Sequence, residues 1–212
     1  MTHGPTDIQV QSASTSSLHP AIISPSYVIG RSPSRAHAAP TTFPDWMHVV
    51  RELGGVFVVD KGENITAFAD TESLAGLYLA LVDDALGIIE EGKPVSEEVW
   101  GPRGHYFAAD LEVSMREFAT EWLLPALRRA GKKGEVLAGD GEVREVGVER
   151  VVELVLGRVG GGLEANIWSR HIAEGFGTSM RVRGSRAKKF LGYQGVGGLP
   201  GLDHAVKLGV DM

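Results

Sequence analysis

Short apolar runs and longer segments with helical spacing alternate along the chain. The short runs are rich in β-branched and aromatic residues, which favour strands. They occupy 20–24, 56–59, 65–68 and 105–108. Between the second and third runs, the polar segment 60–63 contains a glycine and predicts a hairpin turn that joins the two strands.

The longest helical pattern follows Asp70. Apolar residues recur from Leu74 to Ile89 at steps of three and four, which places them on one face of a helix. Asp70 is suited to cap this helix, and Glu72 suits its positive amino end. We therefore expect the helix to pack against a sheet or another helix through that face.

The same spacing, together with signals at their ends, predicts further helices. Ser114 and Glu117 form a capping box, and Pro125 should kink the helix that follows because proline lacks the backbone donor. Gly54 and Gly192 are suited to end two other helices. The remaining predicted helices span 45–53, 148–156, 185–191 and 202–208.

Strands and helices are thus intermixed, which indicates an α/β or α+β fold with few strands for the length of the chain. Residues 1–19 begin with a Ser/Thr/Gln-rich stretch, and they predict a flexible tail. The proline-rich stretch 31–45 predicts a loop. The folded part is then expected to span 20–212.

The composition and charge of the chain exclude several kinds of functional site and partner. The 212 residues include no cysteine, which rules out disulfides, Cys-ligated metals and a cysteine nucleophile. A formal net charge of −6 with dispersed basic residues argues against nucleic acid and anionic membranes as partners. No stretch reaches the roughly 18 apolar residues of a membrane span, and residues 1–18 lack the features of a secretory signal. We therefore expect a cytoplasmic protein.

Two glycine-rich segments resemble phosphate-binding motifs in spacing alone. Segment 160–165 (GGGLEA) fits a dinucleotide fingerprint, but the valines before it have helical spacing, whereas that fingerprint follows a strand. We interpret it as a helix stop followed by a loop. Segment 87–93 has P-loop spacing, but Pro94 replaces the magnesium-binding Ser or Thr, and Glu90 and Glu91 would repel phosphate. It is interpreted as a helix exit.

Other candidate chemistry is sparse. Tyr27 precedes Arg31 by four residues, which on a helix would pair a phenol with a cation, but the surrounding prolines and glycine predict a non-helical segment and a structural tyrosine. The seven histidines show no metal-ligand spacing, so no metal site is predicted. Arg181, Arg183 and Arg186 form either an anion-binding edge or a solvated basic edge.

Four segments, in order, carry a resemblance to a known family. They are 21–30 (AIISPSYVIG), 62–79 (GENI and FADTESLAGLYL within it), 105–119 (HYFA and SMREFA within it) and 185–193 (SRAKKFLGY). Their order and spacing resemble the C-terminal half of an extended short-chain dehydrogenase/reductase of the NAD-dependent epimerase/dehydratase type. Within that family the resemblance is closest to homologues common in filamentous fungi.

The resemblance implies an α/β fold made of a truncated Rossmann-type sheet remnant at about 20–90 and the smaller C-terminal substrate lobe at about 91–212. The family's glycine-rich phosphate turn, catalytic Ser or Thr and Tyr-x-x-x-Lys pair belong to a part that this sequence does not match.

The resemblance also implies roles for particular residues. Pro25, Ser26, Tyr27 and Gly30 would lie near the nicotinamide end of a cofactor site. Arg181 or Arg183 would lie near the polar end of a substrate. No catalytic residue can be assigned, because the residues that carry the family's chemistry are not matched.

Three interpretations of function follow. In the first, the protein belongs to small-molecule or secondary metabolism and binds a small molecule without redox chemistry and without a cofactor. Under this interpretation it could instead assist a partner enzyme or a cofactor-free isomerisation or cyclisation. In the second, it is an NAD(P)-dependent oxidoreductase or epimerase whose site is completed by another chain or by residues outside this sequence. In the third, it is an interaction protein that forms a homodimer or binds a partner enzyme through an exposed sheet edge. The unmatched cofactor and catalytic motifs favour the first.

Overall fold

A computed structural model describes residues 4–31 and 41–211 of the chain. The loop predicted at 31–45 falls largely outside these residues. None of the helices in the described part has both the length and the apolar character that a membrane crossing requires.

Helices contribute most of the regular structure. They are α1 (Gly4–Ser12), α2 (Phe43–Leu53), α3 (Thr71–Glu91), α4 (Met115–Glu117), α5 (Leu124–Arg129), α6 (Lys132–Ala138), α7 (Val148–Val159), α8 (Leu163–Gly177), α9 (Ser185–Leu191) and α10 (Leu202–Asp211), with a 3-10 turn η1 (Gly101–Arg103) and a π-helical segment η2 (Phe118–Leu123). The strands are β1 (Ile22–Pro25), β2 (Tyr27–Ile29), β3 (Phe57–Val59), β4 (Ile65–Asp70), β5 (His105–Ala108), β6 (Leu111–Ser114) and β7 (Arg144–Val146).

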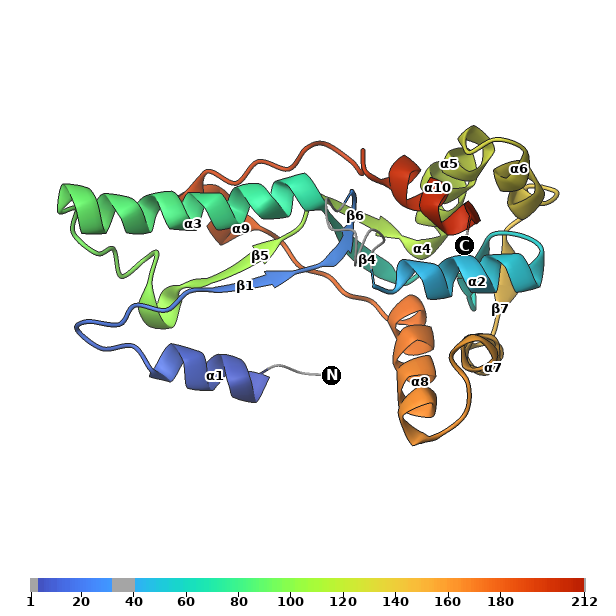
Figure 1. Ribbon diagram of the computed structural model, residues 1–212, viewed down its shortest axis with the longest axis horizontal. Helices are drawn as coiled ribbons and strands as arrows, with labels where there is room; N and C mark the ends of the chain where they lie inside the picture. Colours follow the sequence, from blue (N-terminus) through green and yellow to red (C-terminus); the bar gives the residue numbers. More distant parts are fainter. Residues whose placement is uncertain (1–3, 32–40, 212) are drawn as a thin grey trace.

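The strands form small sheets in which parallel pairing dominates. Strand β1 pairs with β5 in parallel, and β3 pairs with β7 in parallel. Strand β4 lies between β2, which is parallel to it, and β6, which is antiparallel. Figure 1 shows α3 and the β1–β5 pair at one end of an elongated molecule, most other helices at the opposite end, and β4 between them. The predicted α/β class is therefore confirmed.

The hairpin predicted at 60–63 is wrong. A turn is present there, with Asp60 at φ 52° and Gly62 at φ 67°. It does not pair β3 with β4, because β3 pairs with β7 instead. All residues of β3 are buried, as expected for a strand that is covered on both faces. Its unbroken run of apolar residues is typical of such a strand.

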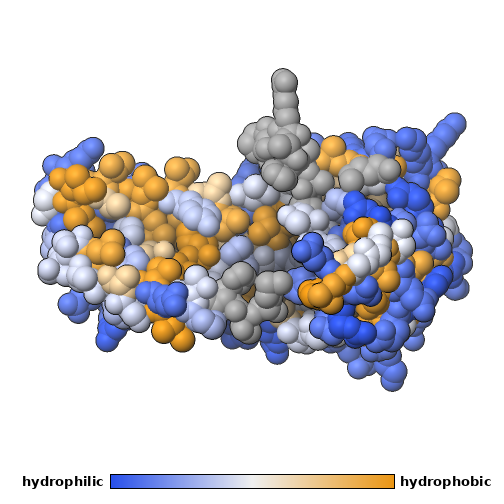
Figure 2. All heavy atoms as spheres, turned by 60° about the horizontal axis from the view of Figure 1, so that its bottom comes forward, coloured by the Kyte–Doolittle hydropathy of each residue, from blue (hydrophilic) through white to orange (hydrophobic). Residues whose placement is uncertain are grey.

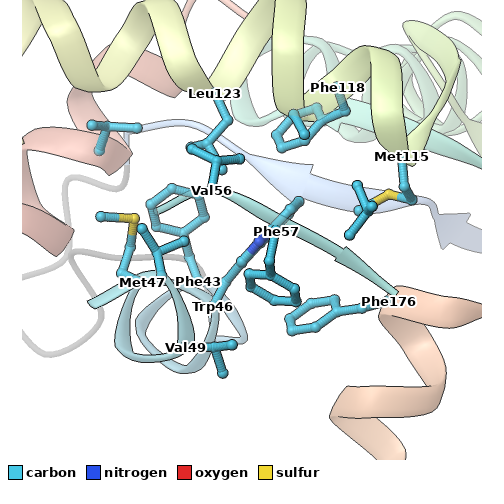
Figure 3. Close-up of a cluster of buried hydrophobic side chains, with 14 of the residues drawn as sticks. Phe43, Trp46, Met47, Val49, Val56, Phe57, Met115, Phe118, Leu123 and Phe176 are labelled. Atoms are coloured by element: carbon cyan, nitrogen blue, oxygen red, sulfur yellow. The ribbon is translucent and has the colours of Figure 1, made fainter. Parts of the chain in front are cut away.

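The larger hydrophobic core gathers aromatic rings from α2, β3, β4, η2 and α8. Trp46 lies at its centre, with its ring centroid 4.8 Å from that of Phe118 and 5.0 Å from that of Phe176. Phe68 of β4 stacks on Phe118 at 4.5 Å. Figure 3 shows Trp46, Phe118 and Phe176 converging from separate elements. Offset aromatic contacts of this kind add to the free energy gained from burial alone.

A second core lies under α3. Leu77 and Leu81 of α3 pack with Tyr106 of β5 and Ala187 of α9. Both cores contain residues from before and after position 90, so contacts within the cores do not mark a division there. The predicted boundary near residue 90 between sheet remnant and substrate lobe stays a prediction.

The helix ends largely follow the sequence signals. The Asp70 side chain accepts a hydrogen bond from the amide of Glu72 at 3.0 Å, as a capping residue should. Gly54 and Gly192 end α2 and α9 in the left-handed conformation, with φ 65° and 64°. Ser114 accepts a hydrogen bond from the amide of Glu117 at 3.0 Å.

Two further segments add detail to the sequence-based expectations. The flexibility predicted for residues 1–19 stays a prediction. Within them, α1 forms a helix at Gly4–Ser12 that lies against η1. It buries none of its residues, which explains why apolar spacing gave no signal for it. The disturbance expected at Pro125 takes the form of the π-helical segment η2, which lies just before it, where proline cannot donate to the preceding turn.

Candidate functional site

The predicted cofactor residues begin at the carboxyl end of β1. The parallel register places Pro25 opposite Ala108, so both strands end at the same level. Ser26 follows and is buried. Its hydroxyl and its backbone amide both donate to the carbonyl of Ala108, at 2.9 and 3.1 Å. Ser26 therefore links the carboxyl ends of β1 and β5. Its hydroxyl can still accept a hydrogen bond from a ligand, but its proton is already donated to Ala108.

Tyr27 has a packing role in this structure. Its ring lies 6.0 Å from that of Phe68, its partner across the β2–β4 pair. A Cβ added to Gly175 of α8 would lie 2.7 Å from the Tyr27 hydroxyl oxygen, so the phenol reaches the surface of α8. Burial raises the pKa of Tyr27 to about 12. The phenol thus stays protonated at neutral pH and is poorly suited to act as a base.

Gly30 lies where backbone segments approach most closely. A Cβ at this position would lie 2.2 Å from Oγ1 of Thr71, and a Cβ on Gly201 would lie 2.3 Å from the Gly30 Cα. The Gly201 amide donates to the Asp70 side chain at 2.9 Å. Glycine at position 30 is therefore required for packing, whatever further role it has. The cofactor role implied for Pro25, Ser26, Tyr27 and Gly30 stays a prediction.

Arg181 already has a partner. Its Nε and Nη2 atoms donate to Oε1 of Glu112 at 3.0 and 2.6 Å. The preceding Met180 is fixed to β4 by backbone hydrogen bonds to Ile65 and Ala67, both at 2.9 Å. Glu112 pairs with Ala67 from the other side of β4. The ion pair therefore links the two edges of β4, and a ligand would have to compete with Glu112 for this guanidinium.

Arg183 differs from Arg181 in both position and partners. Both side chains are exposed, but Arg183 makes no ion pair in the described part of the chain. The next residue, Gly184, lies against the carboxyl end of β5, where an added Cβ would lie 3.0 Å from the carbonyl oxygen of Phe107. The backbone at Arg183 is therefore close to the carboxyl end of β5, where Ser26 binds Ala108.

Arg186 is not available for an anion. Its Nη2 donates to the carbonyl of Glu98 at 2.6 Å, and its guanidinium lies 4.7 Å from the ring centroid of Phe190. Of the anion-binding edge considered for Arg181, Arg183 and Arg186, only Arg183 makes no ion pair among the described residues.

A hydroxyl–imidazole pair on the same strands was missed by the sequence reasoning. Oγ of Ser24 lies 2.8 Å from Nε2 of His105. Phe107 stacks on His105 at 5.1 Å and is 37% exposed. Both strands were predicted, but the residues are 81 positions apart and nothing in the sequence indicated that their strands pair. The pair places a hydroxyl and an imidazole on the side of the sheet that carries the exposed Phe107.

A buried polar network closes the same region. Asp110 accepts from the Asp70 amide at 2.7 Å and from the hydroxyl of Tyr193. Burial and the neighbouring carboxylate of Asp110 raise the pKa of the Tyr193 phenol. The Ser73 hydroxyl accepts from the amide of Val196 at 3.1 Å. These bonds tie the segment after α9 across the start of α3 and keep the strand ends in place.

Two surface hollows have other chemistry. One, of about 400 Å³, is lined by Glu63, Glu112 and Glu117 together with Arg116, so carboxylates prevail in it. The other, of about 430 Å³, lies between η1 and the segment after α1, where Arg103 is paired with Glu98. Neither offers an unpaired cation among the residues that line it. Within the described ranges, no group of three or more His, Asp or Glu side chains could hold a metal ion.

Comparison with known proteins identifies the fold. No protein-family model matches the chain, and no curated protein matches its sequence. Among solved structures, it is similar to DesIV, a dTDP-glucose 4,6-dehydratase from Streptomyces venezuelae with NAD and TYD bound, at 17% identity and a TM-score of 0.55, covering 96% of this chain and 48% of that one. It is also similar to PbgP3 from Burkholderia pseudomallei, at 15% identity and a TM-score of 0.59, covering 98% and 52%.

The chain therefore has a partial Rossmann-like fold of the kind found in extended short-chain dehydrogenases/reductases of the dehydratase/epimerase type. It spans about half the length of the solved structures that it matches. The fold expected from the resemblance is confirmed at this level.

Replacement of Gly30 tests the packing that positions the site. Gly30→Ala should lower the free energy of unfolding by about 1–3 kcal/mol, because the new methyl group meets Thr71 in a filled space. Gly76→Ala is the matched control: no atom lies within 4 Å of an added Cβ, and alanine in the interior of α3 should stabilise by about 0.5–1 kcal/mol. Urea unfolding measures both. Equal stability of wild type and Gly30→Ala would contradict the packing role.

Proposed function

We propose that this chain binds an anionic small molecule at the carboxyl end of the β1–β5 pair and carries out no hydride transfer by itself. The observation that carries the proposal is Arg183, an exposed arginine without an ion-pair partner in the described part of the chain, next in sequence to Gly184, which packs against this strand end. In α/β sheets, ligands bind outside the carboxyl ends of the strands. A guanidinium is suited to bind phosphate or carboxylate groups with two parallel hydrogen bonds.

The chemistry around Arg183 supports binding more than catalysis. The Ser26 proton is already donated to Ala108, and the phenol of Tyr27 is protonated and packed against α8. The sequence contains no glycine-rich turn in the strand-to-helix setting that holds a pyrophosphate at a helix amino end. The ligand class follows by analogy with DesIV, which is named for a nucleotide sugar. The cytoplasmic location stays a prediction.

A second candidate is an NAD(P)-dependent oxidoreductase or epimerase whose cofactor half lies outside this sequence. This candidate is favoured by the exposure of the two-stranded β1–β5 sheet. In the described part of the chain, these two strands form a sheet of their own, and Phe107 on its open side is 37% exposed. Parallel sheets are usually covered on both faces and extended by further strands. The same unpaired edge would serve the third interpretation, an interaction protein that binds a second copy or a partner enzyme.

Replacement of Arg183 tests the proposed site. Titration calorimetry with dTDP-glucose, and with pyrophosphate as the minimal anion, should give dissociation constants about 10- to 100-fold weaker for Arg183→Ala than for wild type. The loss corresponds to a charged hydrogen bond worth about 1.5–3 kcal/mol. Arg150→Ala is the control, since Arg150 is exposed on α7 and paired with Glu153 at 3.0 Å. Absence of binding, or an equal effect of both replacements, would refute the assignment.

Cofactor titration separates the first candidate from the second. The purified 212-residue chain should not bind NAD(H) or NADP(H) at micromolar concentration, because the amide cradle for their pyrophosphate is missing from the sequence. Quenching of the fluorescence of its four tryptophans reports binding directly. A micromolar dissociation constant for either cofactor would overturn the non-redox proposal and favour the oxidoreductase.

A further inference from the structure

Helix α3 turns an apolar face outward. The residues that it buries are Ser73, Leu77, Leu81 and Gly87. On the other side lie large side chains that remain exposed, from 43% for Leu86 to 78% for Ile89. The set consists of Tyr78, Leu79, Val82, Leu86 and Ile89, called here the outer face of α3. Helical spacing was expected to bury most of these positions, and for this set the expectation is wrong.

The outer face is continuous. At about 100° per residue, its side chains span roughly 100° of the helix circumference, the width of the stripe with which a helix usually contacts a core. Figure 2 shows apolar side chains gathered over the end of the molecule that holds α3, β1 and β5. Contiguous exposed apolar surface of this kind marks an interaction site rather than ordinary solvent-facing surface.

Carboxylates border this face on one side. Glu72, Asp83 and Glu90 are exposed and, by helical geometry, lie next to the apolar stripe. They make no ion pair within the described part of the chain, whereas Glu91 pairs with Lys93 at 2.9 Å. Asp84 lies on the buried side of the helix, away from the outer face, and accepts from Trp100 at 2.7 Å. Helix α3 contains neither Lys nor Arg.

We infer that the outer face of α3 binds a partner protein through an amphipathic helix whose apolar side is bordered by Lys or Arg. A helix is the fitting shape, because the side chains of Tyr78, Val82 and Leu86 at steps of four form a ridge that packs into the groove of another helix. The border cations of that helix would pair with Glu72, Asp83 and Glu90. Charge complementarity of this kind selects the partner and speeds its association.

The same charges exclude other occupants. A second copy of α3 brings no cation to the acidic border, because the helix has none. In an antiparallel pair of copies, the two acidic borders would face each other and repel. An anionic membrane surface would repel them as well. Binding at α3 goes beyond the proposed small-molecule site and uses none of its residues, so either can fail without the other.

A pair of synthetic helical peptides tests the inference. Both carry leucines at steps of three and four, and one has Lys at the border positions where the other has Glu. By fluorescence anisotropy, the full chain should bind the Lys-bordered peptide at least 10-fold more tightly than the Glu-bordered one. Val82→Asp/Leu86→Asp should weaken binding of the Lys-bordered peptide at least 10-fold. Both positions are exposed, so the fold should survive, which circular dichroism checks.

Charge reversal makes the test specific. Glu72→Lys/Asp83→Lys/Glu90→Lys should invert the preference, so that the Glu-bordered peptide binds more tightly. The control Glu52→Lys/Glu63→Lys/Glu121→Lys changes three exposed residues by the same net charge elsewhere and should leave the preference unchanged. Equal binding of both peptides, or inversion by the control as well, would overturn the inference. Dimerisation of the chain by light scattering that is lost in Val82→Asp/Leu86→Asp would also overturn it, in favour of a second copy.

Discussion

The burial of β4 is the constraint on which the rest of this structure depends. Every residue of the strand after Ile65 is buried, and both of its edges carry hydrogen-bonded neighbours. Strand β2 and Met180 share one edge, and β6 occupies the other. A buried strand must satisfy all its backbone groups, so each segment that binds β4 is held at a fixed register. Phe68, on this strand, joins the aromatic core by stacking on Phe118.

Hydrogen bonds at the carboxyl end of β4 hold the segments of the candidate site in place. Asp70 ends the strand, caps α3 and accepts from Gly201, while its own amide donates to Asp110. Asp110 lies just beyond β5, whose end meets Ser26 and Gly184. The buried end of one strand thus fixes the start of α3, the end of β5 and the segment that carries Arg183. Ligand-binding residues held by such rigid elements need little reorganisation on binding.

Many helix ends could be predicted from the sequence, but most of the pairing between strands could not. Asp70, Gly54 and Gly192 signalled their helix ends because a cap is a contact between near neighbours in the chain. The partner of β3 was missed, because a short apolar run does not say which distant strand will lie beside it. The candidate site shows the same limit. Arg181 and Arg183 look alike in sequence, and both are exposed. Only the position of Glu112, 69 residues away from Arg181, distinguishes the paired guanidinium from the one that makes no ion pair in the described part of the chain.

Two parts of this fold carry different chemistry: the strand end beside Arg183, and the outer face of α3 with its acidic border. We propose that a small anion binds at the strand end. Amide correlation spectra of the isotopically labelled chain, recorded while dTDP-glucose is added, test this claim most directly. The largest shifts are expected on Ser26, Phe107, Arg183 and Gly184. Shifts confined to the hollow around Glu63 and Glu117, or to α7 and α8, would contradict it.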